Sequence, residues 1–398
     1  MLDIRPFSLS PLPQIVFGAG VIAQLPELIL RFGTRVVLVT GARSFTATPH
    51  WRALTETLRA ADVQWEVVRI TGEPSPQVID GAVRQCRATG APYHIVIGIG
   101  GGSVLDAGKA IAGLLPSGDS VMNYLEGVGR GLTYRGPALP YIAVPTTAGT
   151  GSEATKNAVL SVGGSNGYKK SFRDDQLVPR FAVVDPMLLS TLPRAQIAAN
   201  GMDAFTQLLE ALVSANANPF IDTLAYHGIE IFYASFFTAL AGEDDPQARA
   251  GTAYAALLSG IALAQVGLGS VHGIASPLGA FFPVPHGVAC GTLLATATAT
   301  NIRALQTRAS QHPALEKYAR VGRLLNGDAQ LDTHDACAAL CAKLNEWERH
   351  TAMPPLREYG VTDADVARIA AHSRGNSMKT NPIMLTDQEV ASIVRARL

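Results

Sequence analysis

The sequence predicts an α/β domain with a parallel sheet over residues 1–186, followed by an all-helical domain over residues 187–398. The first half alternates short β-branched apolar runs with helical patterns, which is typical of strands covered by helices on both faces. After Asp185-Pro186 the chain is rich in alanine and leucine at helical spacing and contains no convincing strand. A length of 398 residues also exceeds what one core usually serves, so two domains are expected.

Strands and helices alternate along the first domain. The predicted strands are Arg35–Thr40, Gln64–Ile70, Tyr93–Gly100, Tyr141–Pro145, Thr155–Val162 and Phe181–Asp185. The predicted helices are Trp51–Ala61, Pro76–Gly90 and Ser103–Leu115. Because parallel strands need long crossover connections, this alternation predicts a parallel sheet covered by helices.

The second domain is predicted to contain helices only. Its main helical patterns cover Ala195–Ala215, Asp222–Ala239, Pro246–Val266, Cys290–Leu305, Pro313–Leu325 and Thr333–His350. Thr386 and Glu389 have the spacing of a capping box, so we expect the last helix to begin there.

Composition excludes several classes of partner. The 32 basic and 32 acidic residues balance, so no overall charge attracts nucleic acid or an anionic membrane. The first residues lack the pattern of a signal peptide, and the apolar segment Ala255–Val266 is too short to span a bilayer. The four cysteines show no disulfide framework, and Cys337 and Cys341 share a helix face typical of a core. We therefore expect a reduced, cytoplasmic protein.

A glycine run follows the third predicted strand and opens a helix. It consists of Gly100, Gly101 and Gly102, followed by Ser103. Glycines let backbone N–H groups approach a phosphate, and the helix N-terminus adds partial positive charge. We expect Ser103 to cap this helix with Asp106 as its capping-box partner, and Lys109 to neutralise phosphate. The alternative is a tight strand-to-helix turn with no ligand.

A second loop of small residues follows the Tyr141–Pro145 strand. Its hydroxyl groups suit contacts with phosphate, ribose or nicotinamide, and they belong to Thr146, Thr147, Thr150 and Ser152. Two such loops at strand ends of one sheet predict a dinucleotide that crosses the carboxyl edge.

The loop after the first predicted strand bears on the choice between NAD and NADP. An acidic residue often holds the ribose 2′-hydroxyl of NAD at this place, but Gly41 is followed here by Ala42, Arg43 and Ser44. Arg43 and Ser44 could accept a 2′-phosphate, which favours NADP over NAD. Lys170 is a further candidate for the cofactor or an acidic substrate, with a solvated turn as its alternative.

Two histidines flank a break in the helical pattern of the second domain. His272 precedes Pro283 and Pro285, which cannot continue a helix, and His286 restarts one. Two imidazoles on either side of such a turn can face one point and hold a metal or a polarised carbonyl. The alternative is two buried histidines satisfied by backbone hydrogen bonds.

Asp203 and Gln207 lie four residues apart on one face of a predicted helix. A carboxylate that points inward from an alanine- and leucine-rich helix is costly unless it is paired or ligating. The alternative is an aspartate that caps or hydrogen-bonds a neighbouring loop.

These motifs together resemble the iron-containing (group III) alcohol dehydrogenases. The matching boxes are IVFGAG at 15–20, GGGSVLDAGKAIA at 100–112, PTTAGTGSEAT at 145–155, GMDAFTQLLEA at 201–211 and VHGIASPLGAFFPVPHG at 271–287. The resemblance implies a dinucleotide-binding domain, a helical domain, a catalytic divalent metal (Fe²⁺ or Zn²⁺) in the cleft between them, and a homodimer. The metal-ligand positions of that family fall on Asp203, Gln207, His272 and His286.

The chain departs from that pattern at two positions. Gln207 stands where the family usually has histidine, and Ser276 stands where it commonly has a histidine near the nicotinamide. An amide oxygen is a weaker ligand than imidazole for iron or zinc, so the site could be weaker, choose another metal or be empty. Ser276 removes a proton relay or enlarges the pocket.

We therefore predict an NAD(P)-dependent oxidoreductase that interconverts a small alcohol and its aldehyde or ketone. The carbonyl would be polarised by a divalent metal or by His272 and His286, with Asp203 as the third catalytic residue. One alternative is an NAD-dependent lyase similar to dehydroquinate synthase, which shares this architecture, although few lysines and arginines surround the metal box. The other is a nucleotide-binding protein whose catalytic site has eroded at Gln207 and Ser276.

Overall fold

The computed structural model describes residues 6–242 and 244–398. It divides into two compact units. The sheet unit comprises Ser10–Val162 and Lys169–Leu192. The helical unit comprises Gly163–Tyr168 and Pro193–Leu398, together with the described residues before Ser10.

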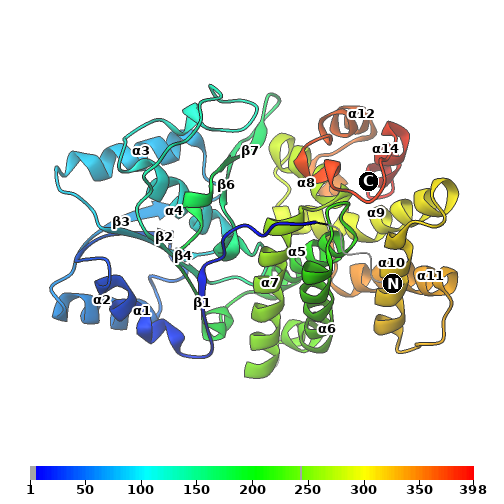
Figure 1. Cartoon of the computed structure of the whole chain (residues 1–398), viewed down its shortest axis with the longest axis horizontal. Coiled ribbons are helices and arrows are strands. Elements are labelled where there is room, and N and C mark those ends of the chain that lie inside the picture. The colour runs from blue at the N-terminus through cyan, green and yellow to red at the C-terminus, as the bar shows by residue number, and fades with distance from the viewer. Residues whose placement is uncertain (1–5, 243) are drawn as a thin grey trace. The chain divides into compact units, whose positions relative to one another are not determined.

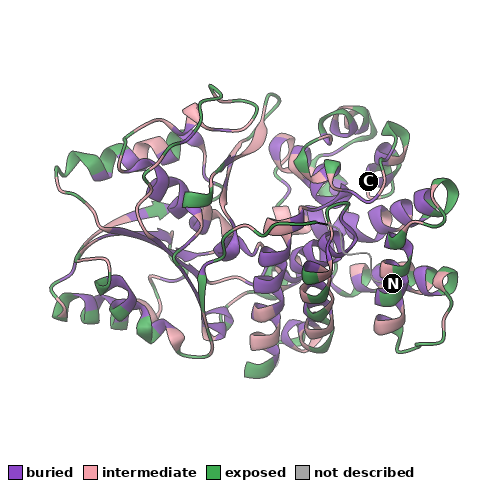
Figure 2. Cartoon of the chain, in the orientation of Figure 1, coloured by how far each residue is buried: buried purple, intermediate pink, exposed green. Residues whose placement is uncertain are grey.

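The sheet unit is built on six parallel strands in the order β1-β8-β5-β4-β2-β3. Their bounds are β1 (Gln14–Phe17), β2 (Arg35–Gly41), β3 (Gln64–Ile70), β4 (Ile95–Gly100), β5 (Tyr141–Pro145) and β8 (Phe181–Val184). The middle strands are buried along nearly their whole length (Figure 2), as their continuous apolar runs predict. The sequence did not reveal β1, because this four-residue strand lies at the sheet edge and is largely exposed.

Helices cover both faces of this sheet (Figure 1). They are α1 (Leu25–Leu30), α2 (Pro49–Ala60), α3 (Pro76–Ala88) and α4 (Gly102–Leu114). Alternate strand residues such as Val36 and Leu38 form one core with the apolar side chains of α1 and α2, and α4 packs over β4 and β5 on the other face. The prediction of a parallel sheet between two helical layers is confirmed.

A separate two-stranded sheet joins β6 (Asn157–Val162) to β7 (Tyr168–Arg173). The β7 strand was not predicted, since its sequence YKKSFR is polar and lacks an apolar alternation. Short 3-10 helices complete the description: η1 (Val21–Gln24), η2 (Val121–Asn123), η3 (Ser152–Ala154), η4 (Asp175–Leu177), η5 (Pro186–Leu189) and η6 (Leu356–Tyr359).

The described residues from Pro193 onward contain helices and no strand, as predicted. The helices are α5 (Arg194–Val213), α6 (Pro219–Ala241), α7 (Pro246–Val266), α8 (Ser270–Phe281), α9 (His286–Arg308), α10 (Pro313–Asn326), α11 (Thr333–His350), α12 (Asp363–His372), α13 (Asn376–Lys379) and α14 (Asp387–Arg395). The capping box of Thr386 and Glu389 opens α14, as expected.

The break between α8 and α9 lies where the prolines predict it. The α8 helix ends at Phe281, and α9 begins at His286 directly after Pro285. Across the described residues no single helix is long and apolar enough to cross a membrane; α7 and α8 meet that criterion only as a pair bent by 98°.

Candidate functional site

Three loops gather at the carboxyl edge of the six-stranded sheet. They follow β5, β4 and β2, which are neighbours in the sheet, so the two predicted phosphate loops and the Gly41–Ser44 segment leave the same edge. The Thr146 N–H donates to the Gly100 carbonyl at 3.0 Å. A Cβ on Gly102 would lie 2.7 Å from Thr150 Oγ1. The loops after β4 and β5 are therefore in contact, and only glycine at position 102 allows this approach.

The predicted capping of α4 by Ser103 is wrong. The helix begins one residue earlier, at Gly102, and its N-cap is Gly101, which offers no side chain. Asp106 instead accepts hydrogen bonds from Ser152 Oγ at 2.5 Å and from the Val159 N–H at 3.1 Å. It therefore ties α4 to the loop after β5 and to β6.

Lys109 does not point to a phosphate either. Its side chain is fully buried, donates to Thr155 Oγ1 at 2.7 Å and lies 3.3 Å from Asp106. Burial lowers the Lys109 pKa, although the neighbouring Asp106 opposes this shift. A buried cation needs a partner of opposite charge, and the contacts of Lys109 with Asp106 and Thr155 join α4 to the end of the loop after β5.

The other proposed cofactor residues lie in two places. Arg43 and Ser44 are exposed in the turn after β2, and a Cβ on Gly41 would lie 3.6 Å from Ser44 Oγ. Lys170 lies on β7 of the separate two-stranded sheet, where its Nζ is 3.9 Å from the Cβ position of Gly127. Arg43 and Ser44 thus belong to the carboxyl edge of the main sheet, whereas Lys170 comes from another element.

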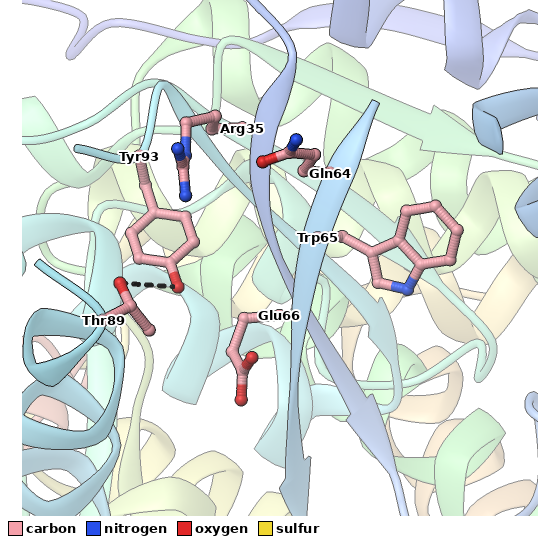
Figure 3. Close-up of a pocket in the computed structure, with 6 residues that line it drawn as sticks. All are labelled: Arg35, Gln64, Trp65, Glu66, Thr89 and Tyr93. Atoms are coloured by element: carbon pink, nitrogen blue, oxygen red, sulfur yellow. Dashed lines mark hydrogen bonds between the residues drawn. The ribbon is translucent and has the colours of Figure 1, made fainter. Parts of the chain in front are cut away.

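A small open pocket of about 180 Å³ lies at the opposite edge of the sheet (Figure 3). Arg35 and Gln64, the first residues of β2 and β3, line it together with Trp65, Glu66 and others. Nucleotides bind outside the carboxyl ends of parallel strands. This pocket is at the amino ends and contains none of the predicted site residues.

In the helical unit, four side chains from three helices converge on one point. Asp203 comes from α5, His272 from α8, and His286 and Cys290 from successive turns of α9. One donor atom from each lies within 4.8 Å of all the others. His272 Nε2 is 3.2 Å from Asp203 Oδ1 and 3.6 Å from Cys290 Sγ. His286 Nε2 is 3.8 Å from Asp203 Oδ1 and from Cys290 Sγ.

Glu210 fixes the orientation of His272 from behind. Its Oε2 is 2.7 Å from His272 Nδ1, and its Oε1 accepts the Val271 N–H at 2.7 Å. An ionised carboxylate can only accept, so Nδ1 carries the proton and Nε2 is left to face the cluster. For His272, the alternative of a histidine satisfied by the backbone is therefore wrong, because its partners are two carboxylates.

Gln207 lies one turn after Asp203 on α5 and is buried. Its Oε1 lies 2.7 Å from the hydroxyl oxygen of Ser259 on α7, which lies equally close, at 2.7 Å, to the Ala256 carbonyl. One end of the amide is thus held by a side chain outside the cluster of Asp203, His272, His286 and Cys290. Ser276, the other departure, lies on α8.

Burial and mutual charge set the protonation of this cluster when no cation is present. Burial alone would raise the Asp203 pKa, but the His286 and His272 imidazoles overcome it and bring the pKa to about 2. Burial opposes charge on His272, yet Cys290, Asp203 and Glu210 raise its pKa well above the usual value. Burial raises the Cys290 pKa to about 12. Without a cation, the His272 imidazole and the Cys290 thiol therefore keep their protons, and Asp203 stays ionised.

The donor set fits a divalent transition metal. Imidazole, carboxylate and thiolate are the ligands that zinc and iron take in proteins, and a glutamate behind a ligating histidine is a frequent supporting contact. Sequence reasoning missed Cys290 and Glu210. Their spacing could have revealed them, since Cys290 follows His286 by four residues and Glu210 follows Asp203 by seven.

A parallel sheet with glycine loops at its carboxyl edge and a helical unit with a metal-ligand cluster define a nucleotide- and metal-dependent class of enzyme. Residues 13–186 match the family described as iron-containing alcohol dehydrogenase. Residues 197–398 match the description Fe-containing alcohol dehydrogenase family, C-terminal. The chain belongs to the iron-containing alcohol dehydrogenase family.

Individual relatives agree with this assignment. Alcohol dehydrogenase 4 of Saccharomyces cerevisiae is 30% identical over 397 residues, 99% of each chain. The crystal structure of a 1,3-propanediol oxidoreductase has a TM-score of 0.88 at 29% identity and covers 99% of this chain and 100% of that one. The sulfoacetaldehyde reductase of Bifidobacterium kashiwanohense, solved with NAD⁺, has a TM-score of 0.81 at 25% identity over 99% of each chain.

The chain is thus an NAD(P)-dependent oxidoreductase of the alcohol dehydrogenase type, as the sequence predicts. The family uses a divalent metal. The same relatives favour this reading over the dehydroquinate-synthase-like lyase.

Proposed function

We propose that the chain interconverts a small aldehyde or ketone and its alcohol with NADP(H), and that Asp203, His272 and His286 form its catalytic centre. The observation that carries this proposal is the convergence of these three side chains from α5, α8 and α9. Hydride transfer to a carbonyl needs an electrophile for the substrate oxygen, and the chemistry of this buried cluster suits that role.

Each residue has a distinct role in the proposed reaction. Asp203, His272 and His286, with Gln207 as a possible fourth donor, would hold Fe²⁺ or Zn²⁺, which supplies Lewis acidity toward a carbonyl oxygen. Glu210 keeps the Nε2 atom of His272 directed at the cluster. Without a cation, the imidazoles of His272 and His286 could donate hydrogen bonds to the developing alkoxide.

The proposed nucleotide site consists of the loops at the carboxyl edge. The glycine loop and the first turn of α4 would hold the pyrophosphate, and the hydroxyls of the loop after β5 would contact ribose or nicotinamide. The preference for NADP rests on Arg43 and on the absence of a carboxylate in the sequence Gly41–Ser44. Since the sulfoacetaldehyde reductase was solved with NAD⁺, both cofactors belong in the test.

We further propose a homodimer that resides in the cytoplasm. The edge strand β1 supports the dimer, because its exposed Ile15 and Phe17, with Leu12 before it, offer an apolar edge for pairing. The four free cysteines fit a reducing compartment. Size-exclusion chromatography with light scattering would give the molar mass of the assembly in solution. Ile15→Lys should yield a monomer if β1 forms the interface.

The function is tested by mixing the purified protein with NADPH or NADH and a panel of small aldehydes and ketones. We expect loss of reduced-cofactor absorbance, faster with NADPH, and loss of this activity after chelation that returns when Zn²⁺ or Fe²⁺ is restored. Tight cofactor binding without turnover of any carbonyl would overturn the proposal in favour of an eroded site. Conversion of substrate with no net consumption of cofactor would favour a lyase.

A further inference from the structure

Cys290 completes a four-donor arrangement at the cluster. It follows His286 by one helical turn, so both side chains leave the same face of α9. The thiol is fully buried, and its Sγ lies 3.6 Å from His272 Nε2 and 3.8 Å from His286 Nε2. Its nearest polar neighbours are therefore side chains that the proposed function assigns to a metal.

The distances match the edges of a tetrahedral site. With bonds of about 2.0–2.1 Å to nitrogen or oxygen and about 2.3 Å to sulfur, the tetrahedral edges are about 3.3 Å and, where sulfur is involved, about 3.6 Å. The edge from His272 Nε2 to Asp203 Oδ1 is 3.2 Å, and the two edges from Cys290 Sγ are 3.6 and 3.8 Å. The edge from His286 Nε2 to Asp203 Oδ1 is 3.8 Å.

Gln207 is less suited to the fourth position. Its amide is engaged by Ser259 at 2.7 Å, and ligation would have to compete with or share that contact. An amide oxygen also suits magnesium, calcium or manganese, whereas a thiolate suits zinc.

We propose that the thiolate of Cys290, rather than the amide of Gln207, is the fourth protein ligand of the cation held by Asp203, His272 and His286, and that it selects Zn²⁺ over harder metals. This inference rests on the metal site of the proposed function. Zinc can expand to five ligands, so four protein donors are compatible with the Lewis-acid role.

Cobalt substitution tests the assignment without measuring activity. The chelated, full-length protein is loaded with one equivalent of Co²⁺, and the near-ultraviolet spectrum is searched for a thiolate-to-cobalt charge-transfer band. We expect the band in the wild type and in Gln207→Ala, and its loss in Cys290→Ser. The matched control is Cys86→Ser, which removes another fully buried thiol on α3 and should keep the band.

X-ray absorption on the zinc-loaded wild type gives a second measurement that needs no variant. We expect one sulfur at about 2.3 Å. Competition with a chelator should show that Cys290→Ser weakens zinc binding by at least the roughly 10- to 100-fold that loss of an outer supporting contact costs.

A cobalt or zinc protein with only nitrogen and oxygen ligands would overturn the inference, as would a band that survives in Cys290→Ser. Failure to bind either metal at one equivalent would overturn it as well. These outcomes are separable from the proposed function. Cofactor-dependent turnover with no sulfur ligand rejects only the role of Cys290, whereas a sulfur ligand in a protein without turnover rejects only the reaction.

Discussion

In the sheet unit, the candidate nucleotide site consists of backbone and small side chains at the ends of β2, β4 and β5. In the helical unit, the candidate metal site consists of four reactive side chains from α5, α8 and α9. The first site requires a residue without a side chain at position 102, since a Cβ on Gly102 would collide with Thr150. The second site requires side-chain donor atoms close enough together to share one metal ion. The two sites should therefore fail under opposite kinds of substitution, one by adding a methyl group and the other by removing a functional group.

The largest effect is expected from removing a functional group in the helical unit. Asp203→Ala should lower kcat/KM on the order of 1,000-fold or more, because a polarising cation contributes several kcal/mol and about 1.4 kcal/mol is tenfold in rate. NADPH binding, followed by cofactor fluorescence, should stay within about twofold of the wild type. A variant with full activity would show that the cluster is not the catalytic centre.

Adding a methyl group in the sheet unit should produce the converse result. Gly102→Ala would force the loops after β4 and β5 apart, and overpacking of this kind costs about 1–3 kcal/mol. We expect the Kd for NADPH to rise up to roughly 100-fold, while metal content measured by atomic emission is unchanged. Gly163→Ala is the matched control, since a Cβ there meets no atom within 4 Å. Equal cofactor affinity in both variants would contradict the contact between the loops.

Replacing Glu210 by the isosteric glutamine tests whether the orientation of His272 matters for metal binding. In Glu210→Gln, the amide oxygen can keep the Val271 N–H, so the amide N–H₂ would face His272 Nδ1 and shift the ring proton to Nε2. Metal affinity, measured by competition with a chelator, should fall roughly 10- to 100-fold. Glu348→Gln changes a glutamate paired with Arg397 instead, and it should bind metal as the wild type does.

The smallest effect concerns the third loop. Arg43→Ala should lower the ratio of kcat/KM for NADPH over NADH about fivefold, because an exposed charge–phosphate contact contributes on the order of 1 kcal/mol. Activity with NADH should hold. Arg59→Ala, in the last turn of α2 and stacked over Trp65, is the matched control. An unchanged cofactor ratio in Arg43→Ala would remove the argument for NADP.

The same contrast explains what the sequence could reveal. Buried strands and the Pro283–Pro285 break were predictable because each is a contiguous pattern with a local cause. The edge strand β1 and the polar strand β7 were not, since tertiary pairing rather than local pattern forms them. At α4, the helix begins at Gly102, so its N-cap is Gly101, two residues before the expected Ser103 cap.

The residues whose roles depend on tertiary contacts were the hardest to predict from the sequence. Cys290 and Glu210 lie at helical spacing from His286 and Asp203, but only the packing of α5, α8 and α9 brings them to one point. Lys109 was misassigned because its partners are Asp106, one turn earlier on α4, and Thr155, at the end of the loop after β5. By contrast, Asp203, His272 and His286 come together as the family resemblance implies.

The hydrogen bond from Ser152 to Asp106 and the buried Lys109 beneath it lock two of the three strand-end loops into one block. The turn that carries Arg43 and Ser44 is exposed and stands outside this block. Under the proposed function, substitutions confined to the 42–48 turn should change the preference between NADP and NAD without disturbing the two loops proposed to bind the diphosphate that both coenzymes share.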